Sequence, residues 1–496
     1  MTGGWVSPHE TADDHHERMP TGRDMQRRLD EYPAENLKYW GKASPAGWHP
    51  LLHHSLDVAA TGMALLQGLP ALQGRLAQRL GLTTEQTAQW VAFWLSLHDL
   101  GKFAESFQSQ RADLYLEARG RAPDPAKPYT LRHDSLGMLC WADVVRPVLL
   151  DQAWFGLATE DLADGMDAWM RASSGHHGQP PQPGGHWRQH FDAIQDKPAT
   201  LAHVHCMRQM FLTDDLAVTI SGLDARGFLS ASQELSWWMA GLAVLADWLG
   251  SNTDYFPYIE PGSEPITLAE YWHGARRKAA RAVAASGVVA PASAAALHFG
   301  ELFPELAAPS PLQRWAAEVP LAPGPQFHCL EDVTGAGKTE AALMLVHRLM
   351  AAGVANGLFV ALPTMATANA MYARLTAAYQ RLFNDPASLV LATSGRTLVD
   401  AFAATVVEDL GAGVLPPDAP EGDPAQADQT ASARCAAWLA DHHKRALLSP
   451  AGVGTIDQAL LAVLHSKHQS LRLLGLANKV LVVDEVHACD DYMLKV

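Results

Sequence analysis

Apolar residues in the first half of the chain recur at helical spacing. Four segments carry them at positions i, i+3 and i+4, the pattern of a helix that packs one face against a core. These segments are Leu51–Gly68, Thr84–Leu100, Asp134–Val148 and Gln233–Leu249. Nothing between residues 51 and 250 shows the alternation of a strand, so we expect an α-helical domain there.

The pattern changes after Gln326. Short apolar, β-branched runs now alternate with helical segments, which is typical of an α/β domain. The predicted strands are Phe327–Leu330, Gly357–Leu362, Ser388–Ala392 and Lys479–Val483, and the predicted helices are Thr339–Ala352, Ala366–Phe383 and Asp457–Leu464. The predicted fold is therefore a helical domain followed by an α/β domain.

These changes divide the chain into four parts. We predict a polar N-terminal segment at residues 1–35, the helical domain at 36–255, a linker with a connecting helix at 256–310, and the α/β domain at 311–496. The Pro-, Asp- and Ala-rich Gly411–Ala433 is predicted to be a surface insert.

The composition is that of a globular protein, with 48 % hydrophobic and 18 % charged residues and no run of 18 apolar ones. The polar N-terminus is not a signal peptide, so we expect a cytoplasmic protein with no membrane contact. The five cysteines lie far apart and are expected to be reduced thiols. A net charge of −16 argues against a protein that coats nucleic acid, although a local basic groove remains compatible with it.

Histidines and aspartates in the helical domain form a pattern typical of metal sites. The candidates are His54, the adjacent His98 and Asp99, His133, the adjacent His176 and His177, and Asp247. Neutral imidazoles with carboxylates suit Mn, Fe, Co, Ni or Zn. Asp99 can bridge two ions, and two ions about 3.5–4 Å apart can activate water for phosphoryl displacement. Lys102, one turn after Asp99, is a candidate to neutralise the scissile phosphate.

A lone histidine is more often a surface or core residue than a ligand, and His53 competes with His54 for the ligand role. We prefer His54, because H-x-x-D spacing places it on one helix face with Asp57. Asp57 would then orient His54 from behind, although a plain helix-surface carboxylate explains it equally well.

The α/β domain carries a candidate phosphate-binding loop, Thr334-Gly335-Ala336-Gly337-Lys338-Thr339. It follows a predicted strand and opens a predicted helix, the context that a P-loop requires. Backbone N–H groups of the loop would bind phosphates, Lys338 would reach the β and γ oxygens, and Thr339 would bind Mg²⁺. Asp332 stands where Gly or Ala is usual and is expected to point outward.

Downstream, Asp484 and Glu485 follow an apolar strand, where a P-loop ATPase holds Mg²⁺ and aims its hydrolytic water. Gln313 lies where a superfamily 2 helicase has an adenine-reading glutamine, but an ordinary surface glutamine also fits. Leu362–Thr367 and Val453–Gln458 resemble the DNA-backbone motifs of such motors, with plain strand-to-helix turns as the alternative.

The His-Asp spacings, with Gly-His176-His177-Gly, resemble the nuclease branch of the HD phosphohydrolase superfamily. A domain of this kind ahead of a helicase domain with Asp484-Glu485-Val486-His487 resembles the CRISPR-associated nuclease–helicase of type I systems. The motif sequences resemble those of subtype I-E most. This resemblance covers roughly residues 35–496. It implies an HD-type helical domain followed by a RecA-like domain.

The resemblance also implies ligands and partners. One metal ion would be held by His54, His98, Asp99 and Asp247, and a second by Asp99, His133, His176 and His177. The ions would be iron, cobalt, nickel or manganese, and ATP with Mg²⁺ would occupy the P-loop. Expected partners are single-stranded DNA from the displaced strand of an R-loop and a crRNA-guided surveillance complex, with the protein acting as a monomer.

The family continues with a second RecA-like domain that supplies arginine fingers, so we expect this chain to be truncated after its DEVH box. It should then be a metal-dependent single-strand DNA nuclease, joined to an incomplete 3′–5′ helicase with weak or absent ATPase activity. Two alternatives remain open. One is an HD nucleotide phosphohydrolase with a nucleotide-sensing P-loop domain, and the other is a non-catalytic module that binds DNA or the surveillance complex.

Overall fold

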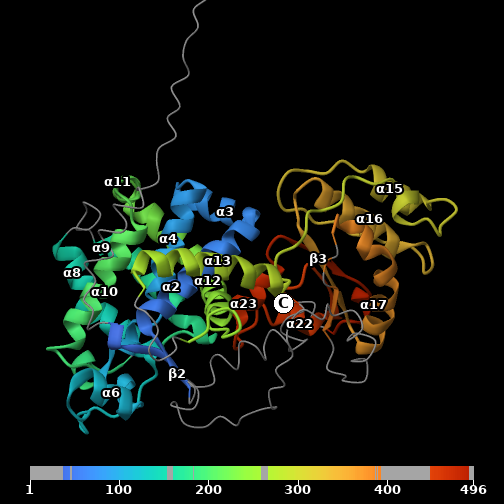
Figure 1. Ribbon diagram of the computed structural model, residues 1–496. Coiled ribbons are helices and arrows are strands. Elements are labelled where there is room, and N and C mark those ends of the chain that lie inside the picture. Colours follow the sequence, from blue (N-terminus) through green and yellow to red (C-terminus); the bar gives the residue numbers. More distant parts are fainter. Residues whose placement is uncertain are drawn as a thin grey trace, which may run out of the picture.

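The computed structural model describes residues 37–44, 47–152, 160–182, 184–258, 266–385, 387, 389–392 and 447–490. The helical part and the larger sheet form two lobes, which meet where α12 (Ala225–Gly250) contacts α23 (Gln469–Leu476) (Figure 1). The predicted fold class is confirmed, with a helical domain followed by a parallel α/β domain. The predicted segment 1–35 and the insert Gly411–Ala433 lie outside the described residues.

The helical domain contains most of the helices. Before α12 these are α2 (Leu51–Gly68), α3 (Pro70–Leu80), α4 (Thr84–Ser96), α5 (Glu105–Gln108), α6 (Ala112–Arg119), α7 (His133–Cys140), α8 (Arg146–Asp151), α9 (Glu160–Ser174), α10 (Asp196–Phe211) and α11 (Asp214–Ser221). The short 3₁₀ helices η2 (Leu100–Phe103), η4 (Gly175–His177) and η5 (Trp187–Gln189) and the π-helical turn η3 (Trp141–Val145) connect them. No described helix combines the length and the apolar character needed to cross a membrane.

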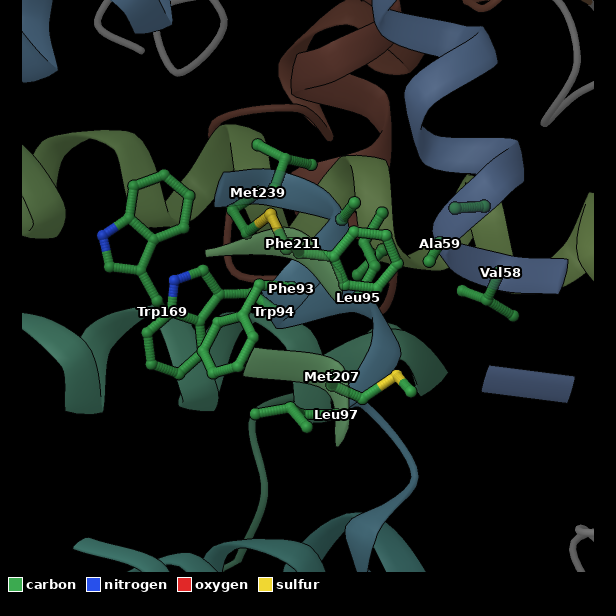
Figure 2. Close-up of a cluster of buried hydrophobic side chains, with 14 of the residues drawn as sticks. Val58, Ala59, Phe93, Trp94, Leu95, Leu97, Trp169, Met207, Phe211 and Met239 are labelled. Carbon is green, nitrogen blue, oxygen red and sulfur yellow. The ribbon is translucent and has the colours of Figure 1, made fainter. Parts of the chain in front are cut away.

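Aromatic residues fill the core around α4. Trp90 and Trp94 of α4 make edge-to-face contacts with Trp169 and Trp141, at ring-centroid distances of 5.8 and 5.5 Å, and all four indoles are buried. Figure 2 shows Trp94, Phe93 and Trp169 from α4 and α9 lying together in this cluster. Such contacts add about 0.5–1.5 kcal/mol each beyond area burial. They therefore fix α4, whose C-terminal end leads directly to His98 and Asp99.

An unpredicted hairpin precedes α2. Strands β1 (Trp40–Ser44) and β2 (Gly47–Pro50) pair antiparallel, with a register shift between Trp40 and Lys42. The Trp40 ring packs on Phe107 at 4.4 Å, so the hairpin is held by a distant part of the chain. Two strands this short give no readable alternation in the sequence.

The helix predicted within the linker forms as α13 (Leu268–Ser286). Thr267 and Glu270 make a capping box at its start, and Gly287 ends it in the left-handed conformation at φ 68°. Tyr271 and Trp272 are buried against the helical domain, so this helix belongs to the helical core in space.

The α/β domain has a four-stranded parallel sheet in the order β4-β5-β3-β6. Its strands are β3 (Gly357–Leu362), β4 (Leu389–Ala392), β5 (Ala451–Thr455) and β6 (Lys479–Val483). Besides α23, the helices of this domain are α14 (Phe299–Leu302), α15 (Pro311–Glu318), α16 (Lys338–Ala351), α17 (Met365–Tyr379) and α22 (Ile456–Leu460). Two 3₁₀ turns, η6 (Gln380–Leu382) and η8 (Val486–Ala488), complete it. Every residue of β3 is buried, as expected for the interior strand of a parallel sheet.

The predicted strand Phe327–Leu330 is wrong. These residues form no strand, and the Phe327 side chain is 93 % exposed. Within the described residues, β6 pairs with β3 alone, and its Leu481 and Val483 are exposed. An apolar run predicts a strand only when a neighbour lies in register to accept its backbone hydrogen bonds, and the run itself carries no information about that neighbour.

Candidate functional site

His98 and Asp99 lie where α4 ends and the chain turns into η2, and both are almost fully buried. The His98 Nδ1–H donates to the Leu95 carbonyl, with 2.7 Å between the nitrogen and the oxygen. That bond fixes the tautomer, so Nε2 carries the lone pair and is free to bind a metal.

Gly101 allows a second ligand segment to approach. A methyl group at this position would overlap the His133 carbonyl and the Gly137 nitrogen of α7. The glycine of the His-Asp-x-Gly-Lys run therefore permits η2 to lie directly against α7. As a result, His133 Nε2 lies 3.2 Å from Asp99 Oδ1.

One group of ligand atoms surrounds the other oxygen of Asp99. His54 Nε2 and His98 Nε2 are each 3.1 Å from Asp99 Oδ2, and the two nitrogens are 3.3 Å apart. Asp247 Oδ1 from α12 is 3.4 Å from His54 Nε2. We call His54, His98, Asp99 Oδ2 and Asp247 the first cluster.

The remaining histidines gather at Asp99 Oδ1. His133 Nε2 and His176 Nε2 lie 3.2 and 3.6 Å from this oxygen, and His177 Nε2 is 2.9 Å from His133 Nε2. We call this set, with Asp99 Oδ1, the second cluster. The structure thus brings all seven predicted ligands together, and Asp99 contributes one carboxylate oxygen to each cluster.

The electrostatics of the site fit cations. Burial lowers the pKa of His176 and His177 well below the usual value, and burial together with Lys42 lowers the pKa of His54 to about 4. Neutral imidazoles therefore point lone pairs at one another inside the protein. Both Asp99 oxygens face imidazole nitrogens at 3.1 to 3.6 Å. A cation in each cluster would satisfy these atoms, so the residues fit two metal ions.

Two lysines supply positive charge. Lys102 Nζ lies 2.8 Å from Asp99 Oδ2 and donates to the Gly41 carbonyl. Lys42 Nζ of β1 lies 3.6 Å from Asp247 Oδ1. Although burial alone would raise the pKa of Asp99, the neighbouring imidazoles of His98 and His133 and the positive charge of Lys102 hold it well below its usual value. Sequence reasoning missed Lys42, because its place in the site depends on the unpredicted hairpin.

The expected role of Asp57 is wrong. Its carboxylate accepts from the Tyr271 hydroxyl, at 2.8 and 2.9 Å, and contacts His49 Nε2 at 2.9 Å, instead of orienting His54. His53 stacks on Tyr271 with ring centroids 3.7 Å apart. The structure therefore places His54 in the first cluster and His53 outside it. Helical spacing put Asp57 near the correct turn, but the packing of α13 on α2 supplied a different partner.

The predicted phosphate loop lies before α16. Gly335 and Gly337 adopt left-handed φ values of 86° and 82°, which side chains other than glycine rarely tolerate. Lys338 Nζ donates to the carbonyls of Asp332 and Val333, at 2.9 and 3.2 Å. Thr339 follows in the first turn of α16, so the N-terminal N–H groups of that helix face the loop.

Gln313 lies against this loop. Its Oε1 accepts from the Ser310 N–H and its Nε2 donates to the Gly337 carbonyl, at 2.9 and 3.3 Å. The side chain is thus part of a capping box of α15 and is nearly buried. Adenine recognition by Gln313 stays a prediction.

Asp484 and Glu485 follow β6 at the carboxyl edge of the sheet, where open α/β sheets bind ligands. The Asp484 N–H donates to the Ala361 carbonyl of β3, and Glu485 adopts a left-handed φ of 55°. The β3–α17 turn at Thr364 and the β5–α22 turn at Thr455 lie at the same edge, because all four strands are parallel. The predicted DNA-contact motifs and the carboxylate pair therefore lie at the same carboxyl edge of the sheet.

Comparison with known proteins points to one family. Residues 40–256 match the family model described as Cas3, HD domain. The CRISPR-associated endonuclease/helicase Cas3 of Escherichia coli is 31 % identical over 480 residues, covering 92 % of this chain and 51 % of that protein. The protein of the same name from Thermus thermophilus is 34 % identical over 462 residues, covering 92 % and 47 %. The crystal structure of T. fusca Cas3-ATP aligns with a TM-score of 0.66 and 28 % identity over 92 % of this chain and 47 % of that one. The chain thus spans about half the length of the curated relatives it matches.

Replacing Gly101 with alanine should push η2 away from α7 and separate Asp99 from His133. We expect a loss of about 1–3 kcal/mol in the free energy of unfolding, from overpacking. Metal titration should also show a weaker second cluster. Gly74→Ala in α3 is the matched control, since a methyl group there meets no neighbour. Equal stability of the two variants would contradict the close-approach role of Gly101.

The metal-free protein should lose stability as the pH falls from 7 to 5. The pKa of the buried His54 and that of the buried His203 are both about 4 when folded, against 6.5 in the unfolded chain. The unfolded chain therefore binds the extra protons, which lowers the free energy of unfolding by about 2 kcal/mol per histidine over this range. Urea unfolding at pH 5, 6 and 7 measures this, and His203→Gln should reduce the loss by the share of that one histidine, about 2 kcal/mol. A flat profile would contradict it.

Proposed function

Because this chain belongs to the Cas3 family of CRISPR-associated nuclease–helicases, we propose that its helical domain is a metal-dependent single-strand DNA nuclease and that its α/β domain binds ATP. The observation that carries the nuclease proposal is the position of Asp99, with one carboxylate oxygen in each histidine cluster. Such a shared carboxylate is the arrangement expected of a site that holds two neighbouring ions.

Each cluster would hold one divalent transition-metal ion. The first cluster offers His54, His98, Asp247 and Asp99 Oδ2, and the second offers His133, His176, His177 and Asp99 Oδ1. A donor set this rich in imidazole favours iron, cobalt, nickel or manganese over magnesium. When bound, two such ions lower the pKa of a coordinated water and offset charge on the attacking and leaving oxygens.

The protein side chains position the substrate around these ions. The contact of Lys102 with Asp99 supports a role for its ammonium group in offsetting the charge of a scissile phosphate. Burial of the ligands removes competing water and strengthens these charge interactions. The backbone carbonyl of Gly41 holds the Lys102 ammonium in place.

The relatives suggest the substrate and the partner. A structure described as a CRISPR RNA-guided surveillance complex, pre-nicking, aligns with a TM-score of 0.54 and 25 % identity over 92 % of this chain and 44 % of that one. We propose the displaced DNA strand as substrate and such a complex as partner, with the protein acting as a cytoplasmic monomer. Unwinding with 3′–5′ polarity is proposed for the whole length of the relatives, of which this chain spans about half.

The α/β domain would bind ATP with Mg²⁺. Thr334, Gly335, Gly337 and Lys338 would hold the phosphates, Thr339 and Asp484 would bind Mg²⁺, and Glu485 would orient the hydrolytic water. Helix dipole and loop N–H groups at the start of α16 support this assignment. We expect slow ATP turnover by this chain, because arginine fingers from a second lobe are worth about 10³–10⁵ in rate in other phosphoryl-transfer enzymes.

Alanine at His98 or Asp99 should remove the nuclease activity. Wild-type protein with Mn²⁺ or Ni²⁺ should degrade single-stranded DNA, and each variant should lose at least about 100-fold in rate. Asp99→Ala should also lose both ions in elemental analysis, because Asp99 serves both clusters. His205→Ala is the matched control, since His205 is exposed. Hydrolysis of deoxynucleotides in place of DNA would favour a nucleotide phosphohydrolase, and no metal-dependent hydrolysis would favour a recruitment module.

Lys338→Ala should weaken ATP binding by about 10- to 100-fold, the range for losing a charge-assisted hydrogen bond. Fluorescence titration with a labelled ATP analogue measures this, and Lys197→Ala on the exposed surface of the helical domain is the control. Nuclease activity should be unchanged in both variants. Wild-type affinity in Lys338→Ala would reject the phosphate-loop assignment.

A further inference from the structure

Helix α23 belongs to the α/β domain in sequence but packs in the helical core. Leu471 and Leu474 are buried within the core cluster of the helical domain. A methyl group at Gly241 of α12 would overlap the backbone of Ser470, so the two helices touch at the level of the main chain. Figure 1 shows α23 beside α12 at the junction of the lobes.

His468, the residue that precedes α23, has an unusual conformation. Its φ is 61°, in the left-handed region that side chains other than glycine seldom adopt. Its N–H donates to the Gly178 carbonyl at 2.8 Å, and its ring packs on Trp248 at a centroid distance of 5.1 Å. Gly178 is itself left-handed, and a methyl group there would overlap the His468 ring. Strained residues of this kind persist where the surroundings fix them.

These two contacts lie next to the metal-binding residues. Gly178 directly follows His177 of the second cluster, and Trp248 directly follows Asp247 of the first. A single residue of the α/β domain therefore contacts the chain beside one ligand of each cluster. Replacing a residue that supports a metal ligand typically changes metal affinity about 10- to 100-fold.

The same segment continues to the carboxylate pair. After α23 the chain passes Asn478, whose carbonyl accepts from the Asn356 N–H and whose side chain accepts from Arg75 of α3, at 2.8 and 3.3 Å. Strand β6 begins at the next residue and leads to Asp484. The segment from His468 to Asn478 is thus fixed to the helical domain at both ends.

We propose that His468 is a positioning residue of the metal centre, through which the α/β domain fixes the His176–His177 turn relative to Asp247. An effect of His468 on DNA cleavage rests on the proposed nuclease function. The positioning itself concerns metal binding.

Titration of the full chain with Co²⁺ tests this proposal, because the visible absorption of bound Co²⁺ reports its coordination geometry. His468→Ala, which loses the ring and disfavours the left-handed backbone, should weaken Co²⁺ binding by about 10- to 100-fold and change the spectrum. His468→Gly keeps the backbone conformation and the N–H group, so it should show a smaller loss. His465→Ala, an exposed histidine three residues upstream, should match the wild type.

A reciprocal variant tests the contact from the other side. Gly178→Ala should weaken Co²⁺ binding because its methyl group overlaps the His468 ring, and combining it with His468→Gly should restore part of the affinity. Wild-type Co²⁺ affinity and spectrum in His468→Ala and Gly178→Ala would overturn the proposal. If His468→Ala does not fold, His468→Gly and the Gly178 pair decide the question. A wild type that binds Co²⁺ but leaves DNA intact would reject the nuclease function and not the positioning role.

Discussion

The helical domain is organised around one buried carboxylate, that of Asp99. An ionised carboxylate in a protein interior costs several kcal/mol unless positive charge and hydrogen bonds offset the loss of water. Lys102 provides one positive charge, and burial lowers the pKa of His176 and His177 so that these imidazoles are neutral. The lone pairs of these imidazoles, which face one another and the carboxylates, are the physical reason why the two proposed cations would be stable there.

Tight packing of the helical domain holds the groups around Asp99 in fixed positions. The indole cluster around Trp94 fixes the end of α4, Gly101 lets α7 approach, and α12 supplies Asp247 from the opposite side. The residues of the two clusters come from five packed segments, namely α2, the turn between α4 and η2, α7, η4 and α12, so no segment can move without disturbing a packed interface. The geometry of the two clusters is therefore set by packing at some distance from Asp99.

Sequence reasoning found the residues of both clusters because imidazole and carboxylate groups at such spacings are typical of metal sites. It also found the order of helices and parallel strands, since periodicity depends on neighbours along the chain. It missed what depends on distant neighbours. Lys42 lies in the site because its hairpin packs on Phe107. Asp57 accepts a hydrogen bond from Tyr271 in place of the expected partner His54. Helix α23 packs in the helical core although it belongs to the α/β domain in sequence. The failed strand at Phe327–Leu330 has the same cause, because an apolar run does not specify its lateral partner.

The distribution of ligands along the chain has a consequence for biosynthesis. All ligands of the second cluster lie between residues 99 and 177, whereas the first cluster extends from residue 54 to residue 247. A chain that emerges from the ribosome in order can therefore close the second cluster before α12 has been made. The first cluster must wait for Asp247, and His468, with its proposed positioning role, follows more than two hundred residues later still. If the proposed ions bind, the order of synthesis would thus separate the loading of the two clusters in time, with Asp99 Oδ2 completing its surroundings last.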